Sequence, residues 1–179
     1  TIATFNARGL CRSGRLAAML AEANRQKINI ILVQEHNWRG KHRDQVEHVC
    51  KRCRFRPYAG YVTGVFNTGG AAILISTDCP AVDLTKAQPR FSMQGSLASV
   101  TVDIDGHRTS LVSVYAPVSA HLRRIFFDRL SKSGAITSNS IVGGDWNCVP
   151  DVSLDVSQAQ SPNSYPNSHA PLLESHLAT

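Results

Sequence analysis

Apolar residues along the chain fall into two spacings, and each spacing predicts a different element. Short apolar or alternating runs predict strands at about residues 1–6, 29–34, 55–62, 71–76, 96–104, 107–115 and 140–145. The run 29–34 is apolar almost throughout, so we expect a central strand that is buried on both faces. The pair Asp105-Gly106 separates two of the runs and predicts a tight hairpin turn.

Apolar residues at every third or fourth position predict helices. We expect one over residues 14–27, capped by Ser13, a second over 119–132, and a short one around 45–53 in a basic, His-rich region. Beyond Pro150, residues 157–168 are rich in Ser, Pro, Asn and Gln and predict an extended loop, and residues 170–177 predict the start of a last helix. Strands and helices that alternate in this way favour the α/β class.

Composition and net charge limit the kinds of function that we expect for this chain. The 179 residues are 42% hydrophobic and contain no repeat or linker, so we expect one domain over 1–179. Lys and Arg number 19 against 13 Asp and Glu, and the formal charge of +6 favours a polyanionic partner whose binding weakens as salt rises; plain solubility is the alternative. No apolar run is long enough for a membrane helix and no signal-peptide pattern is present, so we expect no membrane partner.

The cysteine pattern indicates free thiols. Five cysteines at irregular spacing do not form a disulfide framework, which favours a reducing, intracellular compartment. Cys50 and Cys53 form a C-x-x-C with His42 and His48 nearby, so a zinc site is an alternative to a solvated basic face there.

Polar side chains follow four of the predicted strands. Asn6 ends the run 1–6, Glu35 ends 29–34, and Tyr115 ends 107–115. Asp145 and Asn147 follow the last strand in Gly-Gly-Asp-Trp-Asn, and on an extended backbone residues two apart point to the same face. We therefore expect these five side chains to meet at one rim of the fold, where they could hold a phosphate, a metal ion or a water molecule.

The same strings resemble the endonuclease/exonuclease/phosphatase superfamily, which includes DNase I-like nucleases and apurinic/apyrimidinic endonucleases. TFNARGL, LVQEHN, VYAPV and GGDWN occur in the family's order. The wording of three strings is most similar to the endonuclease domain of non-LTR (LINE-type) retrotransposons: NARGL, QEH and GGDWNCV. That domain nicks target DNA to prime reverse transcription. The resemblance implies a two-sheet α/β sandwich flanked by helices, DNA as partner, a fused reverse transcriptase as a further partner, and nuclear localisation if the origin is a retrotransposon.

The resemblance also implies roles for the five residues in metal-assisted phosphodiester hydrolysis. Glu35 and Asn6 would hold Mg²⁺, with Mn²⁺ as an alternative and no small-molecule cofactor. Asp145 would act as the base toward water, while Asn147, Tyr115 and Asn6 would complete the catalytic group.

Arg8 and His36 are candidates for substrate contacts, although each could instead be an ordinary loop residue. Arg8 stands where some DNA-repair relatives carry an acidic residue, which removes a second carboxylate from beside the metal.

The chain departs from the family after Asn147. The family's downstream N-x-D-like turn and terminal Ser-Asp-His are not found in the remaining residues, so we expect a domain truncated at the C-terminus, its front two-thirds, with no significant nicking by residues 1–179 alone. Two alternatives to a nuclease stay open: a same-fold phosphatase for a small phosphorylated lipid or inositol, and a non-catalytic remnant that binds nucleic acid.

Overall fold

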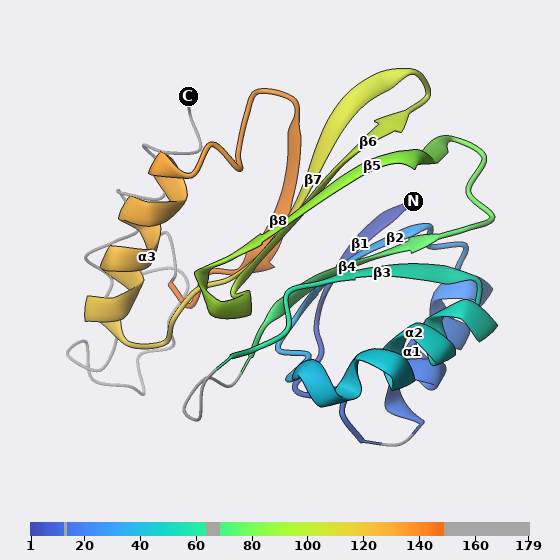
Figure 1. The fold of residues 1–179 in the computed structure, drawn as a ribbon, viewed down its shortest axis with the longest axis horizontal. Coiled ribbons are helices and arrows are strands. Elements are labelled where there is room, and N and C mark those ends of the chain that lie inside the picture. The colour runs from blue at the N-terminus through green and yellow to red at the C-terminus, as the bar shows by residue number, and fades with distance from the viewer. Residues whose placement is uncertain (13, 64–68, 149–179) are drawn as a thin grey trace, which may run out of the picture.

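The computed structural model describes residues 1–12, 14–63 and 69–148, which form two stacked sheets with helices outside them (Figure 1). In chain order the elements are β1 (Ile2–Asn6), α1 (Arg15–Arg25), β2 (Ile30–Gln34), the 3-10 turn η1 (Gly40–His42), α2 (Arg43–Arg52), β3 (Phe55–Ala59), β4 (Ala71–Ser76), β5 (Val82–Ser92), η2 (Met93–Gly95), β6 (Leu97–Ile104), β7 (His107–Tyr115), α3 (Ala120–Lys132) and β8 (Ser140–Asp145). The order of strands is β1-β2-β4-β3 in the N-terminal sheet and β5-β6-β7-β8 in the C-terminal sheet. The predicted two-sheet α/β sandwich is confirmed.

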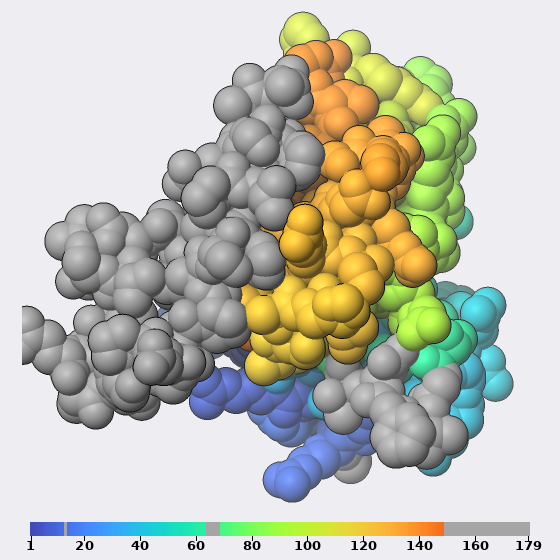
Figure 2. All heavy atoms as spheres, turned by 90° about the vertical axis from the view of Figure 1, so that its left-hand side faces the viewer, coloured from blue at the N-terminus to red at the C-terminus, as the bar shows by residue number. Residues whose placement is uncertain are grey.

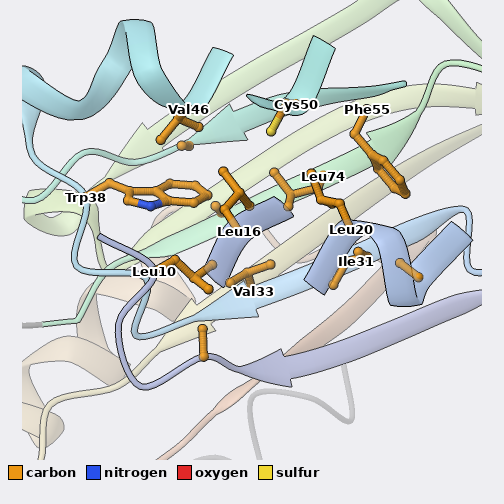
Figure 3. Close-up of a cluster of buried hydrophobic side chains, with 14 residues drawn as sticks. Leu10, Leu16, Leu20, Ile31, Val33, Trp38, Val46, Cys50, Phe55 and Leu74 are labelled. Atoms are coloured by element: carbon orange, nitrogen blue, oxygen red, sulfur yellow. The ribbon is translucent and has the colours of Figure 1, made fainter. Parts of the chain in front are cut away.

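Three apolar clusters hold the layers together. One lies between α1, α2 and the N-terminal sheet and contains Leu20, Trp38 and Leu74 (Figure 3). A second fills the space between the sheets, and a third joins the C-terminal sheet to α3 through residues such as Phe127. Figure 2 shows α3, in yellow and orange, at the surface on that side of the molecule. No helix in the described part of the chain is long and apolar enough to cross a membrane.

Most of the predicted elements are confirmed to within a few residues. Strand β2 is buried along its whole length, as its apolar run predicts. The 105–106 turn has positive φ at both residues, 50° and 81°, which is the geometry of a tight hairpin turn. Helix α1 begins after Gly14, which occupies the N-cap position without a side-chain cap hydrogen bond; Ser13 and the elements expected beyond residue 148 lie outside the described residues.

Strand β5 is an element that the sequence pattern did not predict. Its run Val82–Ser92 is largely polar and contains Pro89, which usually argues against a strand. The strand forms because it lies at the edge of its sheet and pairs with β6 alone, with a register shift between Asp83 and Gln88. An edge strand tolerates both the proline and the exposed polar side chains.

The strand directions bring several chain segments to one end of the sandwich, which we call the site rim. β1 runs parallel to β2, with Asn6 beside Gln34, and β7 runs parallel to β8, with Tyr115 beside Asp145. Parallel neighbours end at the same edge, so each sheet presents two carboxyl-terminal strand ends there. The site rim is therefore built from β1, β2, β7 and β8.

A buried polar bridge fixes how the two sheets are aligned. Gln34, at the end of β2, donates from Nε2 to Ser113 Oγ on β7 over 3.1 Å and to Leu32 O over 3.0 Å. Ser113 Oγ in turn donates to Val33 O over 3.0 Å, and both side chains are at most 2% exposed. Because a buried polar group is costly without a partner, this bridge favours one alignment of β2 against β7.

Replacing Ser113 by Ala should destabilise the fold, because the change leaves a Gln34 amide hydrogen and Val33 O unpaired in the interior. We expect a loss of roughly 1–3 kcal/mol in the free energy of unfolding, measured by urea denaturation. Ser99→Ala is the matched control, since Ser99 is also buried on a strand but makes no side-chain hydrogen bond within the described residues. Equal losses for the two variants would contradict the role given to the bridge.

Candidate functional site

One side-chain amide at the site rim joins the two sheets. Asn6, at the end of β1, donates from Nδ2 to Glu35 Oε1 over 3.0 Å and to Asp145 Oδ2 over 2.7 Å. Glu35 follows β2 in the same sheet, whereas Asp145 ends β8 in the other sheet. The expected convergence of these three residues is confirmed, and it places two carboxylates around a single amide nitrogen.

The backbone around Asn6 orients its amide. The backbone N–H of Arg8 donates to Asn6 Oδ1 over 3.1 Å, which turns the amide NH₂ toward the carboxylates. The following segment is tied to the end of β2, because Ala7 N donates to Gln34 O and Gly9 N donates to Glu35 O. The loops after β1 and β2 therefore form one unit.

Several residues at the site rim have the left-handed backbone conformation that side chains other than glycine rarely adopt. Arg8 has φ 45°, Glu35 has φ 54°, Asn37 has φ 60° and Asn147 has φ 49°. Such conformations cost of order 1–3 kcal/mol each and tend to gather at functional sites. Their concentration beside the two carboxylates supports a functional assignment for this rim.

Asp145 and Asn147 are held by short local bonds. Asp145 Oδ1 accepts from Asn147 N over 3.1 Å while Oδ2 accepts from Asn6, so each carboxylate oxygen has one donor. Asn147 Nδ2 donates to Ala116 O over 2.6 Å, which ties the loop after β8 to the loop after β7. The Asn147 side chain also interacts with the Tyr115 hydroxyl, so it links the two residues at the end of the C-terminal sheet.

Tyr115 lies between the two halves of the site and is 9% exposed. Burial raises the pKa of its phenol, and the neighbouring carboxylates of Glu35 and Asp145 raise it further, while the Asn147 side chain lowers it. The raised pKa keeps the phenol protonated at neutral pH. Tyr115 is therefore a hydrogen-bond donor beside the carboxylates, and all five residues expected at this rim are found there.

The side chains at the rim suit a hard, hydrated cation. Glu35 and Asp145 provide carboxylate oxygens, and Mg²⁺ commonly takes only one or two carboxylates while it keeps several waters. Within residues 1–12, 14–63 and 69–148 no three His, Cys, Asp or Glu side chains gather as a fuller metal cage. A zinc site at Cys50 is not supported either, because Cys50 is fully buried and burial raises the pKa of its thiol to about 12.

His36 does not make the expected substrate contact, because its side chain is fully buried. The ring stacks on Trp38 with centroids 4.5 Å apart, and its Nδ1 accepts from Trp38 N over 2.9 Å. Burial lowers the pKa of His36 to about 4, so the imidazole is neutral at physiological pH. The left-handed turn at Glu35 directs His36 into the core rather than to the rim, and the ring supports the loop that carries Glu35.

Arg8 follows Asn6 in the loop after β1. Its side chain is exposed beside Asn6, and its guanidinium has no carboxylate partner among the described residues.

Three residues that the sequence pattern did not single out support Tyr115 and Glu35. Asn37 exchanges hydrogen bonds with Gly69, because Asn37 N donates to Gly69 O over 2.7 Å and Gly69 N donates to Asn37 Oδ1. A Cβ at Gly69 would overlap the Tyr115 ring, and one at Gly70 would lie 2.6 Å from His36 Cε1. The sequence signal for this support is the Gly-Gly pair directly before β4.

The chain is similar to several solved structures of known proteins. No protein-family model and no curated protein matches it. Among solved structures, an AP endonuclease from Archaeoglobus fulgidus aligns with TM-score 0.68 and 18% identity over 99% of this chain and 69% of its own. The endonuclease domain of TRAS1, a telomere-specific non-LTR retrotransposon, aligns with TM-score 0.55 and 19% identity over 95% of this chain and 67% of its own.

A third similar structure is that of a phosphatase rather than an endonuclease. ANGEL2, a 2′,3′-cyclic phosphatase, aligns with TM-score 0.54 and 11% identity over 83% of this chain and 52% of its own. The chain therefore spans between half and about two thirds of these proteins. Together with the sandwich, these similarities show that the chain has the DNase I-like fold, a two-sheet α/β sandwich flanked by helices.

Replacing Gly69 by Ala should displace the Tyr115 ring. Gly69 has φ 117°, and the added methyl group would overlap ring atoms that the core holds in place. Gly106→Ala is the control, because Gly106 also has a positive φ, 81°, but has open space around it. We expect Gly69→Ala to cost roughly 1–3 kcal/mol more in unfolding free energy than the control; equal costs in urea denaturation would show that the ring is not confined.

Proposed function

We propose that this protein is a metal-dependent phosphodiesterase of endonuclease type that nicks DNA. The observation that carries the proposal is the Asn6 amide, which holds the carboxylates of Glu35 and Asp145 together from two different sheets. Such a pair of oxygen ligands at an exposed rim suits a divalent cation and a phosphate of a polymer passing over it.

Each residue has a role that follows from its contacts. Glu35 is the proposed metal ligand, and Asn6 fixes its position from β1. Asp145 is the proposed base, because both its oxygens are acceptors and its orientation is set by Asn6 and by the Asn147 backbone. When bound, Mg²⁺ or Mn²⁺ would neutralise charge on the phosphate and on the leaving oxygen.

Two neutral donors face the carboxylates across the rim. The protonated phenol of Tyr115 and the Asn147 amide that interacts with it are the proposed donors to non-bridging phosphate oxygens as charge builds in the transition state. Arg8, exposed and without an ion pair in the described part of the chain, is the proposed phosphate contact outside the reacting centre.

DNA is favoured over a small phosphate by charge and by exposure. The chain carries a formal charge of +6, and Asn6 and Arg8 lie exposed at the site rim. The similarity to the TRAS1 endonuclease domain supports a retrotransposon origin with a fused reverse transcriptase and nuclear action, all of which we include in the proposal. The similarity to ANGEL2 keeps a phosphatase as the second candidate.

Metal binding should be weak and should depend on Glu35. We expect Glu35→Gln to abolish binding of Mg²⁺ or Mn²⁺, because the variant retains the shape of the side chain but loses its charge. Titration calorimetry with Mg²⁺, or the loss of the free Mn²⁺ signal in electron paramagnetic resonance, measures this. Glu47→Gln, an exposed acid on α2, is the matched control and should bind metal as the parent chain does. Unchanged binding in Glu35→Gln would remove Glu35 from the site and the proposed chemistry with it.

Nicking of supercoiled plasmid with Mg²⁺ tests the catalytic group. Because a catalytic group acts as a unit, loss of one member forfeits most of its effect. The family's downstream N-x-D-like turn and Ser-Asp-His are not found in residues 148–179, so we expect residues 1–179 by themselves to nick no faster than their Asp145→Ala variant. A parent chain that nicks well above Asp145→Ala would show that the described rim is sufficient, and it would overturn the expectation of an inactive segment.

A further inference from the structure

A groove runs along the side of the sandwich where the edge strands of the two sheets face each other. It is lined by residues 55–63 at and after β3, by residues of the segment 89–95 at the end of β5, and by α2 side chains; we call it the β3–β5 groove. Its volume is about 1020 Å³. At one end the Gly60 and Gly95 backbones nearly touch, since a Cβ at Gly60 would lie 3.1 Å from Gly95 Cα.

The β3–β5 groove carries more positive than negative charge. Arg43 and Lys51 from α2 and Arg56 from β3 line it, and Glu47 is its single acid. All three cations are exposed, and within the described residues none lies within 4.0 Å of a carboxylate. Cations that are left without carboxylate partners along a groove favour an anionic occupant.

Aromatic rings alternate with these cations. The Arg43 guanidinium lies 4.9 Å from the centre of the Tyr61 ring, and the Arg56 guanidinium lies 6.0 Å from the centre of the Tyr58 ring. Phe91 on β5 lines the opposite side and is 48% exposed, which is unusual for a phenylalanine. Planar rings and guanidinium groups in one groove provide stacking surfaces as well as charge.

These features of the β3–β5 groove favour a single nucleic-acid strand over a duplex as its occupant. Stacking on Phe91 requires a base face, which a duplex keeps inside its own stack, whereas an unpaired strand offers both its bases and its phosphates. Gly60, in the lining of the groove, lies at the same end of the sandwich as the site rim, because Gly60 N donates to Ala71 O and Ala71 pairs with Gln34, which directly precedes Glu35.

We propose that the β3–β5 groove binds a single-stranded nucleic-acid segment, with phosphates on Arg43 and Arg56 and a base stacked on Phe91. The inference rests on the proposed function, since the strand in the groove continues from the phosphodiester at the site rim. The groove would thus hold an unpaired stretch that flanks the nicked position, and the protein would prefer DNA with such a stretch over a continuous duplex.

The experiment is a fluorescence anisotropy titration with labelled oligothymidylate and with a duplex of the same length, in EDTA so that no metal is bound at Glu35. For Arg43→Ala/Arg56→Ala we expect weaker binding of the single strand and a salt dependence reduced in slope by about 1.4, as two lost phosphate contacts imply. Phe91→Ala should weaken single-strand binding on the order of tenfold with the slope unchanged. Duplex binding should change little in either variant.

Arg124→Ala/Arg129→Ala is the matched control, because it removes the same charge from exposed positions on α3, at the centre of the face in Figure 2, away from α2. Equal weakening by the control pair would mean that only net charge matters and would overturn the proposal. Equal weakening for duplex and single strand in the groove variants would also overturn it. Because the assay contains no metal, its outcome is separate from that of the Glu35→Gln metal titration, which tests the proposed function.

Discussion

The alignment of the two sheets is the constraint on which the rest of the site depends. Each sheet by itself carries only half of the reacting groups: Asn6 and Glu35 end strands of one sheet, and Tyr115 and Asp145 end strands of the other. An apolar interface between sheets is tolerant of sliding, because apolar contacts have little directionality. The buried pair Gln34 and Ser113 supplies the direction, since its hydrogen bonds are satisfied in one alignment and lost in others.

That alignment makes stability and chemistry depend on the same residues. Gln34 directly precedes Glu35, and Ser113 lies two residues before Tyr115, so the bridge lies immediately beneath the groups that we assign to metal and phosphate. The strained backbones at Glu35 and Asn147 are held by the bonds around them, and the native packing has to offset their cost. A rim built in this way is rigid before any ligand binds, which is what a preorganised electrostatic site requires.

His36 and Gly69 show how this rigidity reaches past the reacting groups. His36 contributes its ring to the core instead of to the substrate, and in that position it packs against Gly70, while Gly69 lies under Tyr115. Gly69 and Gly70, directly before β4, are thereby fitted between His36 and the ring of Tyr115. Gly69 and Gly70 must be small, because a side chain at either position would overlap these rings. Both residues also have a positive φ, which glycine adopts without strain.

The sequence by itself determined the elements whose signal is local. Apolar periodicity identified β2, β4, β7, β8 and both long helices, and the Asp105-Gly106 pair identified the hairpin, because each depends on neighbours within a few residues. The polar residues at strand ends predicted which side chains meet at the site rim, since parallel strands that end at one edge present them together. Strand β5 escaped prediction because an edge strand needs only one partner and can be polar.

Tertiary structure alone decided the direction in which His36 points, the confinement of Tyr115 by Gly69, and the groove between β3 and β5. These features depend on contacts between residues far apart in the chain, and no local sequence pattern predicts them.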